Sequence, residues 1–489
     1  MRNTLKMLGI ICIIAATVFI AACGDLLDPT GGGYTVTFNS EGGTAVPSQT
    51  IEKDSGKVLN KPTDPTKTRL DAKKDGGLYK GTPTPVFKGW FNDDGTEYNF
   101  TNQAPITGSF TLSAHWGVSP EKINIPSTVT GTDIILKAIN YIKAQNPGTT
   151  DKYTLAIGND DLNNNNVVEG KGPIVLDTTN IDLTILGIGG QKEITPAFNV
   201  PTSTTNNAQV YLIVGKTTSD PSIKLTLNNV ALRGRTAAVA DSLVRVRNGA
   251  SLTLASSSKI YGHTNNIGNN TSNGENGNGS AVCVVSGGIL TIKEASVVEN
   301  NKSIGTGQTN RNLVGGVYGY NGTIKIEGGQ ILNNECPSDI VDGEKVYTHT
   351  KDIYVIEDVE LTISGDVKIG ELTLNVDTSG SNTKNTVIKI PSSVTNDIDK
   401  LCLRSTEPPS NSNKSATQAL TDTKDKWKGK VILQGTGGYT PSSADVAKFH
   451  LGEFRGTTSF KKLPNNSDQI SDGFKIGTSG TDLGKLIDK

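Results

Sequence analysis

Acidic and histidine side chains are the first residues to consider for chemistry, because paired carboxylates cleave glycosidic bonds and clustered carboxylates or imidazoles bind metal ions. Glu357, Asp358 and Glu360 fall together around one turn, where acidic residues are most often only solvated. The four histidines are far apart and lack the spacing of metal ligands: His115, His263, His349 and His450. We therefore predict a protein that is not an enzyme and that uses no metal and no cofactor.

Residues 161–165, Asp-Leu-Asn-Asn-Asn, begin like a calcium-binding loop. Such a loop needs a glycine at its sixth position and a bidentate glutamate at its twelfth. Here Asn166 occupies the sixth position and Gly172 the twelfth. An ordinary polar loop is the favoured interpretation, and calcium binding is the alternative.

Cys23 is the first cysteine whose sequence context suggests a chemical role. A short basic region precedes an apolar run over residues 8–20, which is too short for a comfortable membrane span. The tetrapeptide that follows, Ile-Ala-Ala-Cys, resembles the lipobox of bacterial lipoproteins, whose cysteine thiol receives a diacylglyceryl group. The resemblance implies a signal peptide over 1–22, a lipid on Cys23 and a tether over 23–33. An ordinary signal peptide with an incidental cysteine is the alternative.

Composition narrows the class of fold and of partner. The chain has 47 basic and 48 acidic residues, and it shows no basic patch, so we expect no nucleic-acid partner. Its 55 glycines and 2 methionines favour many strands and turns over a helical bundle. Beyond the signal peptide and Cys23, the three remaining cysteines allow at most one disulfide: Cys283, Cys336 and Cys402.

Residues 34–117 form a strand-rich stretch with a recognisable set of motifs. These are VTF-x₃-GG, VPSQTIEKDSGKV, KPTDPTK, F-x-GW and LSAHW. The set resembles the B-repeat of internalins, also called the Listeria–Bacteroides repeat, and it implies a small β-grasp-like module. Residues 69–86 are expected to be an inserted loop. Trp90 and Trp116 are expected to be core anchors, and stacking on a ligand is the alternative.

The pattern of apolar residues changes over residues 118–149. Thr132 or Asp133 can cap a helix that buries residues at helical spacing, and Gly148 lies beyond its end. The apolar residues of this helix are Ile135, Ala138, Ile139 and Ile142. We expect the helix to cap the following domain.

From about residue 170 the chain repeats a strand–turn–strand unit. Four such units lie over residues 244–254, 282–292, 317–326 and 353–363, and their last residues are 38, 34 and 37 positions apart. Apolar residues alternate within each unit, so one face of every strand can stack inward. The sequence therefore predicts an all-β protein, with a right-handed parallel β-helix over 150–435 and a C-terminal cap or tail over 436–489.

The same units resemble those of polymorphic outer-membrane proteins and of the pectin-lyase-like superfamily. Gly315-Gly316-Val317-Tyr318 looks like the GGAI element of the former, and Val297-x-x-Asn300 and Ile331-x-x-Asn334 are loose forms of its F-x-x-N element. The resemblance implies the fold more than the function.

Residues that alternate with the inward set are expected to point outward. On the first strand of the units these include two arginines and three tyrosines, which we predict to form an exposed contact stripe for a protein or carbohydrate. The predicted stripe is Arg245, Arg247, Tyr318, Tyr320 and Tyr354. Stacking between repeats, or burial under a loop, is the alternative.

Together these features predict a surface-exposed lipoprotein of the cell envelope, held in the outer membrane by its N-terminal lipid. We expect a non-enzymatic adhesin or interaction protein whose solenoid meets a host or cell-surface protein or glycan. The alternatives are a glycan-degrading lyase or hydrolase with a β-helix fold, and a structural surface-layer protein.

Overall fold

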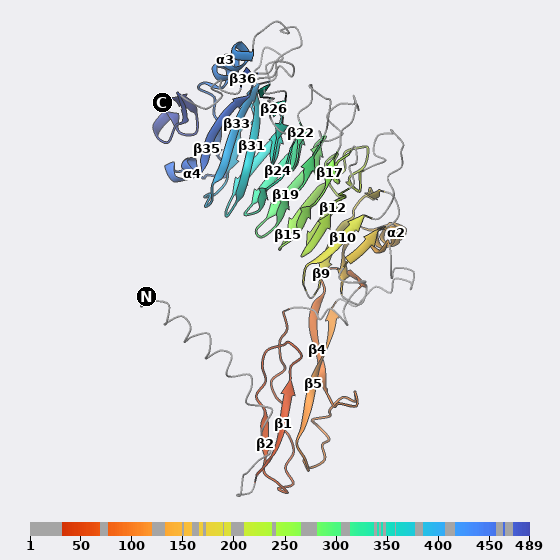
Figure 1. Ribbon diagram of the computed structural model, residues 1–489. Coiled ribbons are helices and arrows are strands. Elements are labelled where there is room, and N and C mark those ends of the chain that lie inside the picture. The colour runs from red at the N-terminus through yellow and green to blue at the C-terminus, as the bar shows by residue number, and fades with distance from the viewer. Residues whose placement is uncertain are drawn as a thin grey trace, which may run out of the picture. The chain divides into compact units, whose positions relative to one another are not determined.

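The computed structural model divides the chain into two compact units (Figure 1), residues 1–68 with 85–117 and residues 69–84 with 118–489. The structure describes residues 32–68, 77–119, 133–148, 151–158, 166–169, 173–188, 190–196, 210–236, 241–265, 281–304, 313–336, 340–341, 344–345, 349–356, 358–376, 385–405, 416–455, 463–464 and 473–489.

The first unit contains a small sheet with the strand order β2-β1-β5-β4. Its strands are β1 (Tyr34–Asn39), β2 (Gln49–Ile51), β4 (Thr84–Phe91) and β5 (Phe110–Ser119). Trp90 is buried, and its ring meets Phe38 and Phe87 edge-on at 5.0 and 5.5 Å. Trp116 is half-buried, and its indole N–H donates to the Ser40 carbonyl at 3.1 Å. Both tryptophans therefore pack in this unit as predicted.

The second unit is built on long parallel ladders. Among the described strands, ten form one sheet, in which every pair except the first is parallel. In order these strands are β3 (Gly77–Lys80), β6 (Lys152–Ile157), β9 (Asp182–Gly187), β12 (Lys224–Asn228), β15 (Ser251–Ala255), β19 (Ile289–Lys293), β24 (Thr323–Glu327), β30 (Glu360–Ser364), β32 (Ile388–Ile390) and β34 (Leu433–Gly435).

A second large sheet has two arms that meet at the long strand β31 (Lys368–Val376). One arm contains β8 (Ile174–Leu176), β11 (Leu212–Val214), β14 (Val244–Arg247), β18 (Val282–Val285), β23 (Val317–Tyr320) and β29 (Ile353–Val355) and, beyond β31, β33 (Ile398–Ser405) and β35 (Phe449–Arg455). The other arm contains β7 (Asn166–Glu169), β10 (Lys192–Pro196), β13 (Val230–Arg233), β16 (Lys259–Tyr261), β20 (Val297–Glu299) and β25 (Gln330–Leu332).

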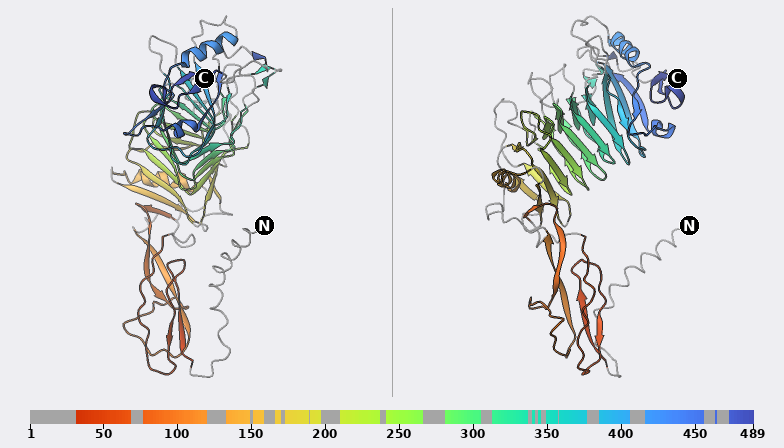
Figure 2. Two further views of the ribbon diagram at one scale, coloured as in Figure 1. Left: turned by 90° about the vertical axis from the view of Figure 1, so that its left-hand side faces the viewer. Right: turned by 180° about the vertical axis from the view of Figure 1, so that it is seen from behind.

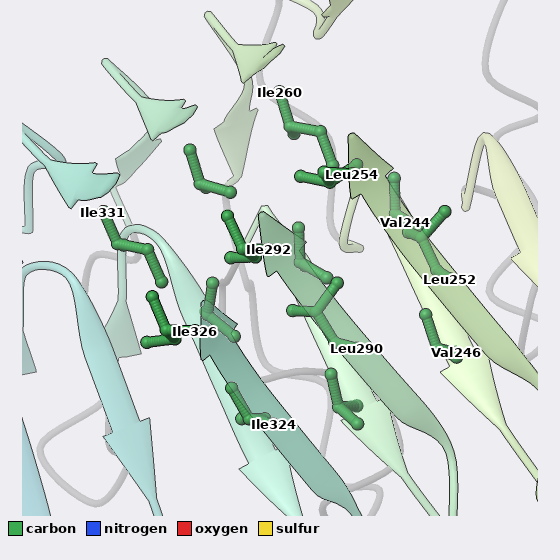
Figure 3. Packing of buried hydrophobic residues seen from close by; sticks show 14 of the residues in the cluster. Val244, Val246, Leu252, Leu254, Ile260, Leu290, Ile292, Ile324, Ile326 and Ile331 are labelled. Atoms are coloured by element: carbon green, nitrogen blue, oxygen red, sulfur yellow. The ribbon is translucent and has the colours of Figure 1, made fainter. Parts of the chain in front are cut away.

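Each repeat thus contributes three consecutive strands, one to each of three parallel ladders. The strands of successive repeats lie side by side along the unit (Figure 2). The predicted inward residues are fully buried, and Figure 3 shows them stacked between the ladders, as with Leu290, Ile292, Ile324 and Ile326. Because a single repeat cannot bury its apolar face, the stack of repeats provides the core. The unit is an all-β, solenoid-like fold with large parallel sheets.

The turn between the first and second strand of a repeat explains several Asn-Gly pairs in the sequence. Asn248, Ser286 and Asn321 occupy equivalent turns with φ of 55°, 52° and 49°. Asparagine tolerates this left-handed region better than most residues. The turns also stack, since Asn248 N–H donates to the Ser286 carbonyl at 2.9 Å.

Both ends of the core are covered. The predicted helix is confirmed as α2 (Ile134–Ala144), which buries its apolar residues in the main core, although Asp133 makes no side-chain capping bond. At the other end lie α3 (Ala416–Trp427), α4 (Ser443–Ala447) and a hairpin of β37 (Phe474–Ile476) and β38 (Leu486–Asp488) (Figure 1). Trp427 and Leu486 are fully buried in the same core. The helix α3 was not predicted.

The prediction of a loop over 69–86 is wrong in part, because Gly77–Lys80 forms β3 and β4 begins at Thr84. The remaining short elements are β17 (Thr264–Asn265), β21 (Lys302–Ser303), β22 (Leu313–Val314), β28 (His349–Thr350), β26 (Ile340–Val341), β27 (Glu344–Lys345), β36 (Leu463–Pro464) and a 3₁₀ turn (Gly480–Asp482). In the part of the chain that is described, no helix has the length and apolar character to span a membrane.

Candidate functional site

The predicted contact stripe is aligned as expected but most of it is buried. Arg245, Tyr318 and Tyr354 occupy equivalent positions on successive strands, with Cys283 between the first two. Their exposed fractions are 2%, 1% and 0%. Tyr320, in contrast, is 41% exposed. The prediction of an exposed stripe is therefore wrong, because three of its five members have no solvent-accessible surface to offer.

A second apolar layer outside the ladder is the physical reason. Tyr318 and Tyr354 cluster with Cys283, Val285 and Val314, and the last of these lies on β22, outside the large sheets. The two tyrosine rings lie 6.0 Å apart in a tilted arrangement. Alternation along a strand tells which face a side chain takes, but not whether other residues cover that face.

Arg245 is held inside this layer by a buried ion pair. Its Nη2 lies 2.8 Å from Asp241 Oδ1, and both side chains are less than a tenth exposed. From the neighbouring column, the Arg404 guanidinium lies 5.6 Å from the ring centre of Tyr354. Arg247 is half-buried. These arginines support the outer layer rather than a free binding face.

The same column leads into a buried charged cluster of Glu371, Lys400, Cys402, Glu453 and Arg455. Arg455 Nη2 lies 2.6 Å from a Glu453 oxygen and 3.2 Å from a Glu371 oxygen. Lys400 Nζ lies 2.8 and 3.4 Å from the same two carboxylates. Two cations thus face two anions; Glu371, Glu453 and Arg455 are less than a tenth exposed, whereas Lys400 is 35% exposed and reaches the cluster from the solvent side.

The chemistry of this cluster is that of a buried ion-pair network. Burial by itself would raise the pKa of both glutamates, but Arg455 and Lys400 outweigh it and hold the pKa of each below its ordinary value. Burial raises the pKa of the Cys402 thiol to about 12, so the thiol stays protonated and is a poor nucleophile. Candidate ligand atoms of Glu371, Cys402 and Glu453 lie within 4.8 Å of one another, but a metal would have to displace both cations.

A ladder of stacked polar side chains runs beside the core. The backbone N–H of His263 donates to Asn301 Oδ1 at 3.1 Å, the side-chain amide of Asn301 donates to Asn334 Oδ1 at 2.9 Å, and the side-chain amide of Asn334 donates to Asp352 Oδ1 at 2.8 Å. Asn300 and Asn334 end the two loose F-x-x-N elements of the sequence. The ladder uses Asn301 instead, because Val297 pairs with Gln330 and position 301 therefore lies opposite 334.

A candidate site is a groove of about 530 Å³ in the first unit, which we call the repeat groove. Aromatic rings and charged groups share its wall, including Lys61, Asp64, Phe87, Glu97, Tyr98 and Phe100. Its size is within the range of small-molecule and glycan sites. The groove could not be predicted from the sequence, because the strand β4, the turn after it and an extended segment around Lys61 meet only in the folded unit.

Two features of the repeat groove bear on what it can bind. Tyr98 is half-buried, stacks edge-on with Phe100 at 4.9 Å, and donates its hydroxyl to Gln103 at 3.0 Å. Lys61 and Asp64 form an exposed ion pair at 3.4 Å. The groove is therefore lined by half-buried aromatic rings and by charged groups that can form hydrogen bonds.

The acidic residues considered for catalysis do not form an open carboxylate cluster in the described residues. Glu360 pairs with Lys389 at 2.7 Å on the exposed face of the ten-stranded sheet. Asp358 is an exposed turn residue with φ of 64°. Glu357 and residues 161–165 lie outside the described residues, as does Cys23. No disulfide joins the three described cysteines.

Comparison with known proteins identifies part of the first unit. The family model of the Listeria–Bacteroides repeat domain matches residues 34–72 and 84–115, which confirms the predicted repeat. No curated protein and no solved structure matches the chain.

Proposed function

We propose that this protein is a non-enzymatic, lipid-anchored binding protein of the cell surface, of the adhesin type. The lipid on Cys23 follows from the export pattern and the Ile-Ala-Ala-Cys motif that precede the repeat. Two or three acyl chains on one residue hold a protein firmly at a membrane. The outer membrane of a cell envelope, with the protein facing outward, is the proposed location.

We also propose that the second unit is a right-handed parallel β-helix of the pectin-lyase-like kind, related to the repeats of polymorphic outer-membrane proteins. Support comes from three strands per repeat, three parallel ladders and fully buried inward columns. In this proposal the second unit is a stiff spacer. The burial of Tyr318 and Tyr354 removes the basis for a contact stripe on this unit.

The repeat groove is the observation that carries the binding role. It brings Phe87, Tyr98 and Phe100 together with Lys61 and Glu97 in one open hollow. Rings that stack on a sugar face, flanked by groups that bond to hydroxyls and carboxylates, suit a glycan. We therefore assign a host or cell-surface glycan as the ligand class.

An extended peptide is a poorer occupant of the same groove. The adjoining strand β4 lies at the edge of its sheet, where a peptide could add a further strand. Pro85 has no backbone N–H to offer, and Lys88 is exposed on this strand. Both residue types discourage strand pairing at an edge.

The test is binding of the full chain, in detergent, to arrays of neutral and charged glycans and of extracellular-matrix proteins. Tyr98→Ala should weaken glycan binding at least tenfold, as expected for an aromatic hot spot. Tyr98→Phe should retain most of the affinity, because the ring remains. Lys61→Ala, at an exposed position, should weaken binding of acidic glycans only.

Tyr320→Ala is the matched control, since it removes an exposed tyrosine from the other unit. Melting curves of all variants show whether the fold is retained. Equal glycan affinity for Tyr98→Ala and Tyr320→Ala in folded proteins would contradict the groove as the binding site. Binding to matrix proteins alone, unaffected by Tyr98→Ala, would contradict the glycan assignment.

A further inference from the structure

The segment that interrupts the repeat family match forms a strand of the other unit. The family match leaves residues 73–83 unmatched, and β3 (Gly77–Lys80) lies within them. Residues 69–84 belong to the second compact unit, although the segments on both sides belong to the first. The chain therefore leaves the first unit, contributes one strand to the second, returns, and leaves again at residue 117.

The strand β3 is anchored on both of its faces. Leu78 is fully buried in the main core of the second unit, and Tyr79 is 1% exposed. Tyr79 packs on the other face of the sheet with Ala156 and Ile188. Leu78 lies opposite Leu155 in an antiparallel register.

Contacts at the end of β3 add to this anchoring. The Thr154 hydroxyl donates to the Gly81 carbonyl, and Gly81 N–H donates to the Lys152 carbonyl. Lys80 Nζ lies 3.0 Å from an Asp151 oxygen in a largely exposed ion pair. The inserted segment therefore pairs with β6 through backbone and side-chain contacts.

The position of β3 in the sheet indicates its purpose. It runs antiparallel to β6, whereas the other described pairs of this sheet are parallel, so it is an addition to the series of repeats and not a member of it. Without β3, the N–H and C=O groups on the outer side of β6 would lie open. An open edge of a long, regular sheet is a template for a strand of another chain.

We propose that β3 is an edge guard, which occupies the outer side of β6 in place of a second copy of this chain. A second copy is the relevant partner because a solenoid that ends in an open edge is self-complementary in its backbone groups, and a surface-anchored protein stands beside many copies of itself. The choice of partner rests on the proposed membrane anchoring, but the inference is independent of the proposed glycan-binding role.

Two variants of the full chain, studied in detergent, test the proposal. In the first, residues 73–83, which lie between the two matched segments of the repeat family, are replaced by a short Gly-Ser turn. In the second, Leu78→Ser and Tyr79→Ser remove both buried side chains and leave the chain path intact. Lys80→Ala, which removes only the exposed ion pair, is the control.

Both test variants should show at least tenfold faster hydrogen exchange of the β6 amides, with an oligomer population that rises with protein concentration. A peptide with the sequence of residues 76–82, added in excess, should reverse the association. The control should behave as the unmodified chain. Unchanged exchange, faster exchange without association, or association that the peptide does not reverse would each overturn the proposal.

Discussion

Replacing Asp352 by Asn should alter the pH dependence of stability in a direction that its surroundings dictate. Asp352 is 3% exposed and ends the polar ladder. Its Oδ1 accepts from the backbone and side-chain N–H groups of Asn334 at 3.1 and 2.8 Å, and its Oδ2 accepts from Glu371 N–H at 2.8 Å. Burial is the largest influence on this carboxyl and raises its pKa to about 6 despite these bonds.

The sign of the effect follows from proton linkage. Between the ordinary pKa of 3.8 and the folded value of about 6, the native protein binds a proton that the unfolded chain has released. The free energy of unfolding therefore falls as pH rises through this window, and the stabilisation is fully present only below it. A rise of this size corresponds to about 3 kcal/mol.

His263 acts in the opposite direction over almost the same range. Burial lowers the pKa of its imidazole from 6.5 to about 4, so its contribution to stability is lost as pH falls between these values. The two effects offset each other in the unmodified protein. Comparison with Asp352→Asn isolates the aspartate, because both proteins contain His263.

The assay is urea denaturation of both proteins at about pH 4 and about pH 7.5. Because pH 4 lies just inside the titration window, the stability advantage of the unmodified protein should be larger by about 2 kcal/mol at the lower pH. Because repeat arrays unfold in stages, hydrogen exchange of the Glu371 amide provides the local measurement. A difference between the two proteins that is independent of pH, or that grows as pH rises, would refute the reasoning.

Leu290→Asp should prevent or severely weaken folding of the second unit, because an unpaired carboxylate would enter a fully buried column at a cost of several kcal/mol. Circular dichroism and melting curves measure the loss of folded protein, and a stable variant would contradict the stacked core. Tyr318→Ala should lower the free energy of unfolding by about 3–5 kcal/mol, the range for truncating a buried aromatic ring, while Tyr320→Ala should stay within about 0.5 kcal/mol of the unmodified chain. Similar losses for both variants would mean that the outer layer is not packed as described. Cys23→Ser should abolish labelling by a palmitate analogue and leave an unprocessed precursor or release the protein, and unchanged labelling would disprove the lipid anchor.

The inward columns of the solenoid could be predicted from the sequence alone. Alternation of apolar residues has a period of two, and a strand can follow it without any knowledge of its neighbours. The equivalence of Leu252, Leu290 and Ile324 therefore emerged from aligning repeats, and the register of the ladders agrees with it. The helix α2 and the burial of Trp90 could also be predicted from the sequence, since each depends on a short stretch of residues.

The outward columns could not be predicted in the same way. Tyr318 and Tyr354 take the face that alternation assigns to them, but residues outside the ladders cover that face. The charged cluster of Glu371, Glu453 and Arg455 shows the same limit, because its members come from β31 and β35, which are far apart in sequence. The sequence shows these residues as isolated charges within apolar strands, but it does not show which residues they pair with.

The sequence by itself determined which residues face the core, since alternation and repetition are written along the chain and need only a local backbone rule. The tertiary structure alone decided which surfaces are covered. Three features depend on segments that are distant along the chain: the burial of an outer face, the pairing of β3 with β6, and the contact between the walls of the repeat groove. Such contacts depend on how loops and insertions return to the ladders, and no local periodicity encodes that path.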